Sequence, residues 1–347
     1  MSRLAVLNAG LSSVQDAGRF GAQRYGLTTS GAMDQFALAA ANALVGNPLT
    51  AAAIEIGPFR AAFEARGGPV RFAVAGAERE MKIGSRVIAA GTSALLLEGE
   101  QLDLGHARGG VFSLLGIEGG VQGPAMFGSL SVTARAGVGS PFPRPLQAGD
   151  ELDVLEASAS AERRLSFTPP EPARLRVLRG PQADEFGDAL ALFLASEWKV
   201  SSASDRMGYR LDGPKLAHLK GHNIVSDGTV NGSVQVPGSG QPIVLMRDRG
   251  STGGYPKIAT VIGPDLGPLA QRRIGASVRF VEVGIEEAEA EARRFAEMIE
   301  SLPQRLEILQ SSPNLEALHG ANLAGHAVNA TDAATWQTAP KNEDKGG

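Results

Sequence analysis

Residues 246–262 read MRDRGSTGGYPKIATVI, and this stretch shows on a small scale the pattern that decides the fold of the chain. Both ends alternate apolar and polar residues, which is typical of half-buried β-strands. The middle, residues 251–257, combines a pair of glycines with hydroxyl, phenol and ammonium groups. A simple hairpin turn needs only about one glycine and one polar residue. We therefore predict that residues 251–257 form a hairpin loop that also lines a ligand cleft.

Short apolar or alternating runs separated by turn residues recur along the whole sequence. The chain has 44 glycines and 20 prolines, whereas aromatic residues make up only 5% of it, which indicates many turns and many short strands. The predicted strands are residues 4–8, 54–56, 70–75, 93–97, 111–117, 174–178, 233–236, 243–246, 258–262 and 278–283. Their spacing favours an all-β barrel or sandwich over alternating strands and helices. We predict a mainly β (β-rich α+β) fold with a few peripheral or buried helices.

The sequence predicts helices in three places. Asp34 can cap a helix that runs to about Val45, with Gly46 just beyond its end, and this segment is apolar on nearly every side. We expect that helix to be buried. Residues 184–196 and 286–301 are the other predicted helices.

The segment ASASAERRLSFTPPEP, residues 157–172, lacks periodicity and is rich in serine and proline, so it is the best internal boundary. We predict a β-rich N-terminal lobe over residues 1–160, a C-terminal lobe over residues 161–285, and a terminal helix with a partly disordered tail over residues 286–347. The final residues, KNEDKGG, are expected to be disordered.

Composition narrows the class of protein. The 347 residues are 43% hydrophobic and 20% charged, as in an ordinary globular protein, and the formal net charge is −4. That charge favours neither a nucleic acid nor an anionic membrane as partner. Cysteine is absent, which excludes disulfides and thiolate chemistry. Because no apolar stretch approaches the length of a membrane span and the start lacks a leader pattern, we expect a cytoplasmic protein.

Several familiar motifs do not occur. We find no P-loop, no dinucleotide-binding glycine fingerprint and no Gly-x-Ser-x-Gly elbow. His218 and His222 are four residues apart, but Gly221 between them weakens a metal-binding helix, so we interpret them as surface histidines and predict no metal site. Met81-Lys82 resembles the centre of a biotin attachment site but lacks its flanking residues, and we interpret it as part of a strand.

Polar residues and glycines cluster in three places instead. The clusters are residues 14–19 with residues 28–34, residues 205–210, and residues 235–257. Each can be a turn with a capping side chain. In the third cluster, however, paired glycines let backbone N–H groups approach a ligand closely, and Thr252, Tyr255 and Lys257 can address an anionic oxygen. Chemistry alone leaves the turn and the ligand site equally open.

Eight stretches carry a family resemblance. They are VQDAGRFG, SGAMD, ANALVGNP, AAIEI, DRMGYRLDG, SVQVPGSGQPIVLM, STGGYPKIATVI and LAQRRIG, and they follow one another in family order. The chain resembles the family of allophanate hydrolase subunit 2, KipA and the C-subunit of bacterial 5-oxoprolinase, which is similar to part of the carboxyltransferase region of urea carboxylase. The resemblance implies cyclophilin-like barrel structure. In many members Gln-Thr-Thr stands where this chain has Gly250-Ser251-Thr252, and many end soon after the last predicted helix.

The resemblance implies that the chain is one component of an ATP-dependent 5-oxoprolinase, which opens 5-oxoproline to L-glutamate. Its expected partners are a KipI-like B-subunit and a lactam-hydrolase A-subunit, and ATP is a co-substrate whose binding component stays open. One alternative is a KipA-type protein that antagonises a KipI-like kinase inhibitor. Another is a component of a biotin-dependent carboxyltransferase whose biotin is carried elsewhere, since we predict no covalently attached biotin here.

We expect the polar clusters to converge on one cleft, with cations and backbone N–H groups around phosphoryl and carbonyl oxygens. The predicted catalytic residues are Lys257, Tyr255, Asp248, Arg206 and Asp16. The predicted ligand-binding residues are Gln15, Arg19, Tyr209, Gln235, Gln241, Thr252, Gly253 and Gly254. On this interpretation Lys257→Ala lowers turnover by about an order of magnitude while stability hardly changes.

Overall fold

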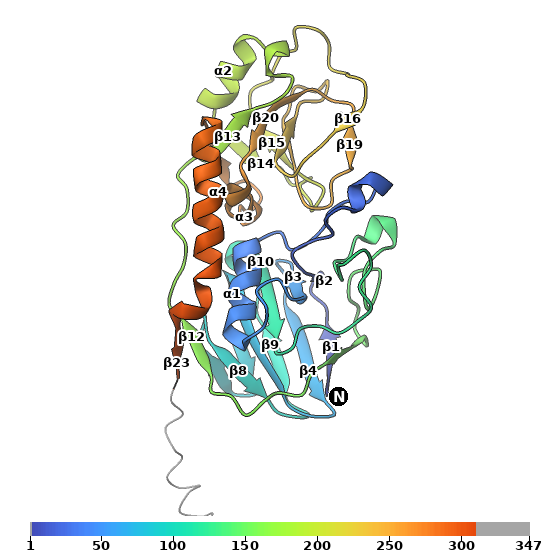
Figure 1. Ribbon diagram of the computed structural model, residues 1–347, viewed down its shortest axis with the longest axis vertical. Helices are drawn as coiled ribbons and strands as arrows, with labels where there is room; N and C mark the ends of the chain where they lie inside the picture. The colour runs from blue at the N-terminus through green and yellow to red at the C-terminus, as the bar shows by residue number, and fades with distance from the viewer. Residues whose placement is uncertain (1, 310–347) are drawn as a thin grey trace, which may run out of the picture. The chain divides into compact units, whose positions relative to one another are not determined.

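The computed structural model describes residues 2–309. The predicted tail, including the stretch NLEALHGANLAGHAVNA and the final KNEDKGG, lies outside the described residues. Within residues 2–309 the chain builds two β-rich lobes, each around its own hydrophobic core. Figure 1 shows the first lobe below and the second above.

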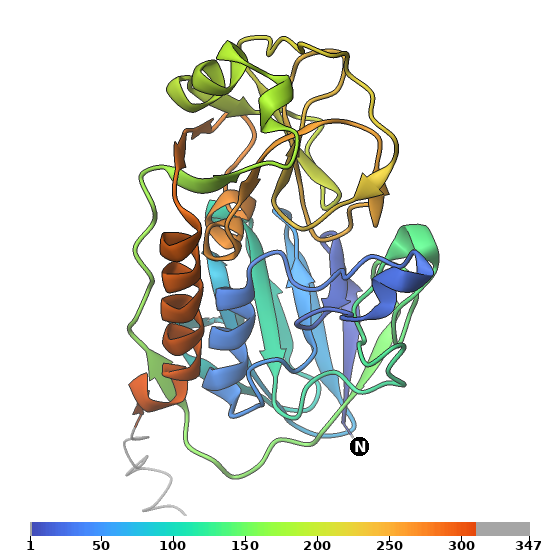
Figure 2. The same cartoon turned by 45° about the horizontal axis from the view of Figure 1, so that its top comes forward.

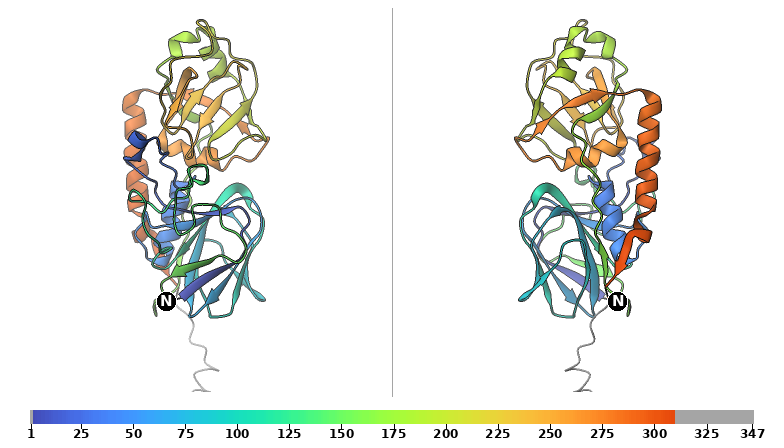
Figure 3. Two further views of the ribbon diagram at one scale, coloured as in Figure 1. Left: turned by 90° about the vertical axis from the view of Figure 1, so that its right-hand side faces the viewer. Right: turned by 90° about the vertical axis from the view of Figure 1, so that its left-hand side faces the viewer.

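The first lobe is made of two antiparallel sheets. Its strands are β1 (Ser2–Asn8), β2 (Ser12–Gln15), β3 (Ala53–Ile56), β4 (Ala61–Arg66), β5 (Val70–Glu78), β6 (Met81–Ile83), β7 (Arg86–Ile88), β8 (Ser93–Leu96), β9 (Gln101–Leu104), β10 (Arg108–Ile117) and β11 (Glu151–Val154). One sheet has the order β11-β1-β4-β9-β6-β7 and the other the order β2-β3-β10-β5-β8. Figure 3 shows the two sheets facing each other.

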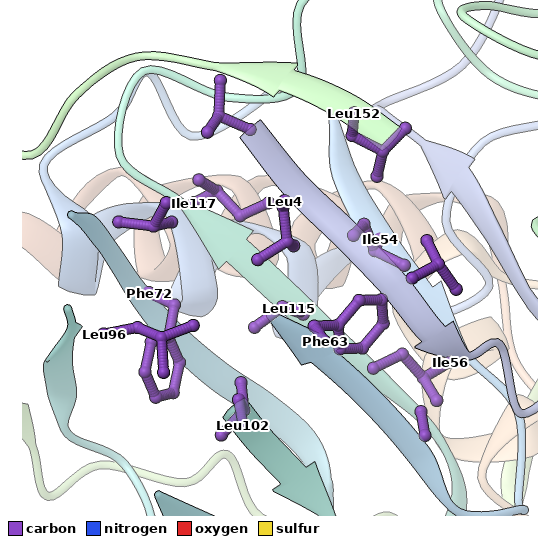
Figure 4. Packing of buried hydrophobic residues seen from close by; sticks show 14 of the residues in the cluster. Leu4, Ile54, Ile56, Phe63, Phe72, Leu96, Leu102, Leu115, Ile117 and Leu152 are labelled. Atoms are coloured by element: carbon purple, nitrogen blue, oxygen red, sulfur yellow. The ribbon is translucent and has the colours of Figure 1, made fainter. Parts of the chain in front are cut away.

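Alternation along the strands places the core of this lobe between its sheets. In β4, Ala61, Phe63 and Ala65 are buried while the residues between them are not, as the twofold side-chain period of a strand requires. Phe63 meets Leu115 of β10 and Leu102 of β9 in the core (Figure 4). The first lobe is therefore closed by side chains from both sheets.

Helix α1 (Gln35–Val45) packs on the five-stranded sheet, against β5 and β10. Its residues from Ala37 to Val45 are all buried, as their apolar character predicted. The Asp34 side chain accepts a hydrogen bond from the Ala37 N–H at 3.0 Å, and Gly46 ends the helix with a φ of 78°. The predicted cap, end and burial of this helix are confirmed.

The second lobe is built around an eight-stranded sheet with the order β21-β14-β15-β18-β17-β20-β13-β22. Its strands are β13 (Leu175–Arg179), β14 (Trp198–Val200), β15 (Gly208–Asp212), β17 (Ser233–Gln235), β18 (Ile243–Leu245), β20 (Lys257–Val261), β21 (Ser277–Val278) and β22 (Phe280–Glu282). Two short strands, β16 (Asp227–Gly228) and β19 (Thr252–Gly253), pair beside it. The predicted fold class, mainly β with barrel structure and few helices, is confirmed.

The remaining helices are short except for the one over Ile285–Glu300. They are η1 (Ala22–Tyr25), η2 (Ala134–Ala136), η3 (Ala183–Glu185), α2 (Asp188–Ala195), η4 (Gly263–Asp265), α3 (Leu266–Ala270), α4 (Ile285–Glu300) and η5 (Leu302–Arg305). The helix predicted over residues 184–196 is interrupted where Gly187 takes a φ of 49°. The helix predicted over residues 286–301 is confirmed as α4.

The chain returns to the first lobe after α4, which Figure 1 shows running beside α1. Leu302 is buried against alanines of α1, and β23 (Leu306–Ile308) pairs with β12 (Arg163–Leu165). The N–H of Arg163 donates to Ser93 Oγ of the first lobe at 2.8 Å. The serine- and proline-rich segment therefore contacts the first lobe, and the predicted domain boundaries stay a prediction.

Candidate functional site

The two lobes are joined by hydrogen bonds along residues 28–32. Ser30 N–H and Thr28 Oγ1 donate to the Arg247 carbonyl of the second lobe at 3.0 and 2.7 Å. On the other side, the Arg19 N–H donates to the Thr29 carbonyl at 2.6 Å. We call this region the inter-lobe seam and define it as residues 15–19, 28–32, 55, 206 and 247–249. Figure 2 shows the blue segment that leads into α1 passing between the strands of the two lobes.

Arg206 lies at the centre of the seam. Its Nε donates to Asp248 Oδ2 at 2.8 Å and its Nη2 to Asp248 Oδ1 at 3.1 Å. The same Nη2 donates to the Gly31 carbonyl at 2.9 Å, and Nη1 donates to Glu55 Oε1 on β3. The local turn is set by Asp205, whose Oδ1 accepts from Met207 N–H at 2.8 Å. Arg206 therefore binds one carboxylate from each lobe.

Glu55 is a buried carboxyl in an otherwise apolar strand. Its Oε2 accepts the Met33 N–H at 2.6 Å. Burial raises the pKa of Glu55 even though Arg206 favours its charged form. Burial also opposes the charge on Arg206, but Glu55 and Asp248 together hold the Arg206 pKa above its usual value. Within the pair, Arg206 keeps its proton and Glu55 gains one more readily than an exposed glutamate does.

Gln15 and Asp16 bind the loops that surround the seam. Gln15 Oε1 accepts the Gly31 N–H at 3.1 Å, and its Nε2 donates to the Val132 carbonyl at 3.0 Å. The Asp16 carboxylate accepts the hydroxyls of Ser129 at 2.7 Å and Ser131 at 2.5 Å, and the N–H groups of Gly18 and Leu130 at 2.8 and 2.7 Å. With four donors on its carboxylate, Asp16 acts as a structural hub in this conformation.

Three further arginines enter the seam, and none of them forms an ion pair with a carboxylate of residues 2–309. Arg19 is 1% exposed and donates to the carbonyls of Met126 and Ser131, which leaves its Nη1 without a hydrogen bond in that range. Buried Arg249 donates to neutral oxygens of Thr29, Asn231 and Thr229, and its Nε has no such bond there. Burial lowers the pKa of both guanidinium groups.

Arg247, the third of these arginines, has the least engaged side chain of the seam. Its guanidinium makes no hydrogen bond or ion pair with any residue in the described range 2–309, although the residue is partly buried. Burial, followed by repulsion from Arg206, lowers the Arg247 pKa to about 10. A cation of this kind can bind an anionic oxygen that residues 2–309 do not supply.

Tyr209 and Gln241 lie away from the ligand cleft that we predicted for them. The buried Tyr209 hydroxyl donates to the Ala270 carbonyl at 2.6 Å, and burial raises its pKa. Gln241 accepts from the Gly213 N–H at 3.0 Å and donates to the Gly213 carbonyl at 2.9 Å. Both side chains thus have complete structural roles: Tyr209 in the core of the second lobe and Gln241 in a turn.

The prediction that residues 251–257 form a hairpin loop is wrong. The flanking strands β18 and β20 do not pair with each other, because β17 lies between them in the sheet. Part of the loop pairs elsewhere, since β19 forms bridges with β16. The alternating pattern identified both strands correctly, but it cannot specify which strand lies next to which.

Lys257 is buried rather than exposed to a cleft. It is 2% exposed, and its Nζ donates to Asp227 Oδ2 at 2.8 Å. Tyr255 is 39% exposed and lies before the start of β20, so its side chain and the buried Lys257 side chain lie in different surroundings. Hydrogen bonding from Lys257 lowers the pKa of Asp227. The pair fixes the β16 segment to the second lobe.

The glycine pair has a packing role on one side. Neither Gly253 nor Gly254 has a positive φ. A Cβ on Gly253 would lie 2.3 Å from Nε2 of the buried Gln235 side chain, so a larger residue there requires that side chain to shift. The exposed Thr252 contributes backbone to β19. Close approach at this loop is therefore made by the protein's own glutamine side chain.

The structure brings together only part of the predicted site. Gln15, Asp16, Arg19, Arg206 and Asp248 meet in the seam, whereas Gln235, Tyr255 and Lys257 lie together in the second lobe. In residues 2–309 no hydrogen bond joins a side chain of one group directly to the other. From the seam, Arg249 donates to the Thr229 carbonyl at 3.2 Å, and the Thr229 hydroxyl donates to the Gly250 carbonyl at 2.6 Å.

Sequence reasoning missed four seam residues: Ser30, Glu55, Arg247 and Arg249. Ser30 Oγ donates to Asp248 Oδ1 at 2.8 Å. A signal was present for Glu55, because a carboxyl inside the apolar run AAIEI is costly unless it is paired. Arg247 and Arg249 flank Asp248 in the opening stretch, and two cations around one predicted carboxylate also indicate a charged site.

Other sequence motifs occupy structural positions. Lys82 lies inside strand β6, as interpreted, with an ion pair to Glu80 at 2.7 Å. His218 contacts the Val236 carbonyl at 2.9 Å and lies against Phe186. In the described part of the chain, no group of three or more histidine, aspartate or glutamate side chains is placed to hold a metal ion. No helix there is long and apolar enough to span a membrane.

A cavity of about 770 Å³ lies apart from the seam. It is bounded by α1, β5, α4 and the segment that follows β12, and aromatic side chains such as Phe36, Phe167 and Phe295 line it. None of the residues predicted for the site lines this cavity. Charged residues such as Arg79, Arg176 and Glu291 also line it, so its walls combine apolar and charged side chains.

Comparison with known proteins gives this arrangement a context. Residues 25–282 match the family model of the carboxyltransferase domain, subdomain A and B. The chain is 38% identical over 294 residues to the 5-oxoprolinase C-subunit of Escherichia coli (strain K12), a match that covers 82% of this chain and 93% of that protein.

Solved structures show the same fold. The crystal structure of TTHA0988 superposes with a TM-score of 0.73 at 34% identity and covers 81% of this chain, while this chain spans only 55% of TTHA0988. The Kluyveromyces lactis urea carboxylase superposes with a TM-score of 0.79 at 26% identity, covering 89% of this chain and 30% of that one. The carboxyltransferase-like fold therefore extends over both lobes.

Proposed function

Because the chain belongs to the family of carboxyltransferase domains with subdomains A and B, we propose that it is the C-subunit of a 5-oxoprolinase. The observation that carries this proposal is the 38% identity to the Escherichia coli protein of that name, over nearly the full length of that protein. The 5-oxoprolinase C-subunit of Haemophilus influenzae is also 38% identical, over 91% of its length. The two relatives carry the same name, and each is matched over nearly its full length, which supports the same role for this chain.

We further propose that the chain works with a KipI-like B-subunit and a lactam-hydrolase A-subunit. The word subunit in the names of both relatives supports such a complex. The length of TTHA0988 supports it as well, since a large part of that protein lies outside the match and can correspond to a separate polypeptide here. On this proposal the chain is inactive alone.

The seam suits the chemistry of this reaction. A five-membered lactam is a poor electrophile, so ATP is the proposed co-substrate and phosphorylates the amide oxygen, releasing ADP. Water then adds to the activated ring carbon, the C–N bond breaks with the nitrogen leaving as the amine of glutamate, and a second water hydrolyses the resulting acyl phosphate to the carboxylate and free phosphate. Oxoproline also carries a carboxylate. Arg247, whose guanidinium has no partner within residues 2–309, is proposed to bind an anionic oxygen, and Arg19 and Arg249 add positive charge behind it. Glu55, whose pKa is raised by burial, is proposed to hold or move a proton beside Arg206.

A reconstitution experiment tests the proposal. The purified chain, the KipI-like protein and the lactam hydrolase are mixed with ATP and 5-oxoproline, and glutamate and ADP are measured while each protein is omitted in turn. We expect 5-oxoproline-dependent ATP hydrolysis only in the complete mixture and none with this chain alone. Full activity of the mixture without this chain contradicts the proposal.

Carboxyl transfer is the second candidate, because the superposition on urea carboxylase covers 89% of this chain. In that case biotin is carried on another protein, and the seam arginines are proposed to bind its carboxylated form. Activity assays with the same purified chain distinguish carboxyl transfer from lactam opening. Biotin-dependent carboxyl transfer in the absence of 5-oxoproline, with no lactam opening, supports the second and contradicts the first.

A further inference from the structure

Two exposed arms carry aromatic side chains next to the seam. The first arm is residues 18–26 and includes η1; the second is residues 123–138 and includes η2. Phe20, Tyr25 and Phe127 are 70%, 61% and 55% exposed, and Met126 is exposed beside them. The arms touch, because the rings of Tyr25 and Phe127 are 5.7 Å apart. The short blue and green helices at the right of Figure 1 and Figure 2 belong to these arms.

The tip of the second arm holds its aromatic residue in an unfavourable backbone conformation. Met126 and Ser129 exchange backbone hydrogen bonds at 2.9 and 3.3 Å around Phe127 and Gly128. These two central residues have φ values of 53° and 76°, as a type I′ turn requires. That position favours asparagine, aspartate or glycine, and a bulky side chain there is strained. Neither core packing nor turn geometry accounts for a phenylalanine that is both strained and exposed.

The arms also carry charge of one sign. Residues 18–26 and 123–138 contain Arg19, Arg24 and Arg135 and no aspartate or glutamate, in a chain whose net charge is −4. The Arg24 guanidinium lies over the Tyr25 ring at 4.9 Å. Neither Arg24 nor Arg135 forms an ion pair with the part of the chain that the structure describes. Exposed aromatic residues together with arginine are the composition of protein–protein hot spots.

The arms are continuous with the seam. Arg19 Nε donates to the Met126 carbonyl at 3.0 Å, and Asp16 accepts the Ser129 hydroxyl at 2.7 Å. On the other side, Arg135 Nη1 contacts Met207 Sδ at 2.7 Å, next to Arg206 in sequence. A protein bound on the arms would thus contact residues that are themselves hydrogen-bonded to buried charged groups of the seam.

We propose that the two arms are the docking surface for the KipI-like partner protein, and that its contacting face is apolar at the centre and rimmed by carboxylates. This inference rests on the proposed function, which supplies the partner, and the charge of the arms specifies that partner's chemistry. Docking there places the partner against the loops that hold Asp16 and Arg19 of the seam, which gives a physical reason for the proposed dependence of activity on the partner.

Calorimetric titration of the full chain with the KipI-like protein tests the surface. The key variant is Phe127→Gly, because glycine fits the positive φ and removes the aromatic ring without loss of fold. Tyr25→Ala is the second variant, and Val87→Ala is the matched control, since Val87 is 64% exposed on β7 away from the arms. We expect Kd to rise tenfold or more for Phe127→Gly and Tyr25→Ala and to stay unchanged for Val87→Ala. The midpoint temperature of thermal unfolding of Phe127→Gly should be no lower than that of the wild type.

The charged rim gives a second readout. Arg24→Glu should weaken binding, and the difference from wild type should shrink as salt concentration rises, because exposed charges are screened. In the complete enzyme mixture, Phe127→Gly should lose activity at limiting partner concentration and recover it at saturation. That recovery separates docking from a direct role in the chemistry.

Each alternative outcome contradicts a specific proposal. Unchanged Kd for Phe127→Gly and Tyr25→Ala overturns the docking surface while leaving the proposed function standing. If the mixture is active without this chain, the proposed function fails, and the titration still decides the surface. Absence of binding by the wild type contradicts both. If the isolated chain dimerises and Phe127→Gly abolishes the dimer, the occupant is a second copy and the inference is wrong.

Discussion

Arg206 and Lys257 are both cations held by carboxylates, yet they differ in what they join. Arg206 binds Glu55 from the first lobe and Asp248 from the second, and Glu55 is 2% exposed. Lys257 binds Asp227 within the second lobe, and the side chain of that aspartate is 54% exposed. The first pair is a tertiary contact between lobes, and the second is a local contact with a partner in water.

This difference shows at which positions the loss of an ion-pair partner should lower the stability of the protein most. A carboxylate that keeps its water loses little when its partner is removed, whereas a buried one is left with an uncompensated charge. Arg206 also lies close to arginines that form no ion pair with a carboxylate of residues 2–309, such as Arg247. No such arginine has been described beside Lys257. We therefore propose that the seam binds the ligand and that Lys257 has a structural role.

The largest expected effect follows from removing the central cation. Arg206→Met leaves Glu55 buried without its partner, so we expect the free energy of unfolding to fall by about 3 kcal/mol in denaturant titrations. The double variant Arg206→Met with Glu55→Gln is the control, and it should recover a large part of the loss because no charge is left unpaired. A loss in Arg206→Met as small as that in Lys257→Met would contradict the comparison.

A smaller effect is expected from Arg247, on activity instead of stability. Arg247→Met removes a guanidinium that has no hydrogen-bond partner within residues 2–309, so unfolding should hardly change. Turnover of the complete enzyme should fall about tenfold, the order of magnitude of one charge-stabilising contact. Arg279→Met, which removes an exposed arginine paired with Glu197, is the matched control and should keep full turnover. Full activity of Arg247→Met would refute the assignment of the seam as the anion site.

The smallest effect is expected at Lys257. Lys257→Met should leave turnover nearly unchanged and raise the pKa of Asp227 towards its ordinary value, because the hydrogen bond from Lys257 is the main cause of its lowered pKa. NMR titration of the Asp227 carboxyl measures this shift. In the wild type the pair stabilises the fold above the unfolded-state pKa of Asp227, and this stabilisation is lost as pH falls through the lowered folded-state pKa. A tenfold loss of turnover in Lys257→Met would instead restore the catalytic role first predicted for it.

Local patterns in the sequence were sufficient for a large part of the fold. Alternation between turn residues located most of the longer strands, since side-chain period is a property of a single strand. Asp34 and Gly46 defined the ends of α1 for the same reason: a cap acts within one helical turn. The polar clusters of the site were also visible, because residue type is itself local information.

Which side chains and which strands lie next to each other was decided only by the tertiary structure. Glu55 and Arg206 are 151 residues apart in sequence, and nothing local to either indicates the other. Likewise, β17 lies between β18 and β20, so a loop that reads as a hairpin instead joins strands that are not neighbours. The sequence by itself determined the elements, their caps and the residue types available for chemistry. Strand order and the burial of each charge depend on contacts between distant segments, and these decided that Arg206 lies in the seam and that Lys257 is held inside one lobe.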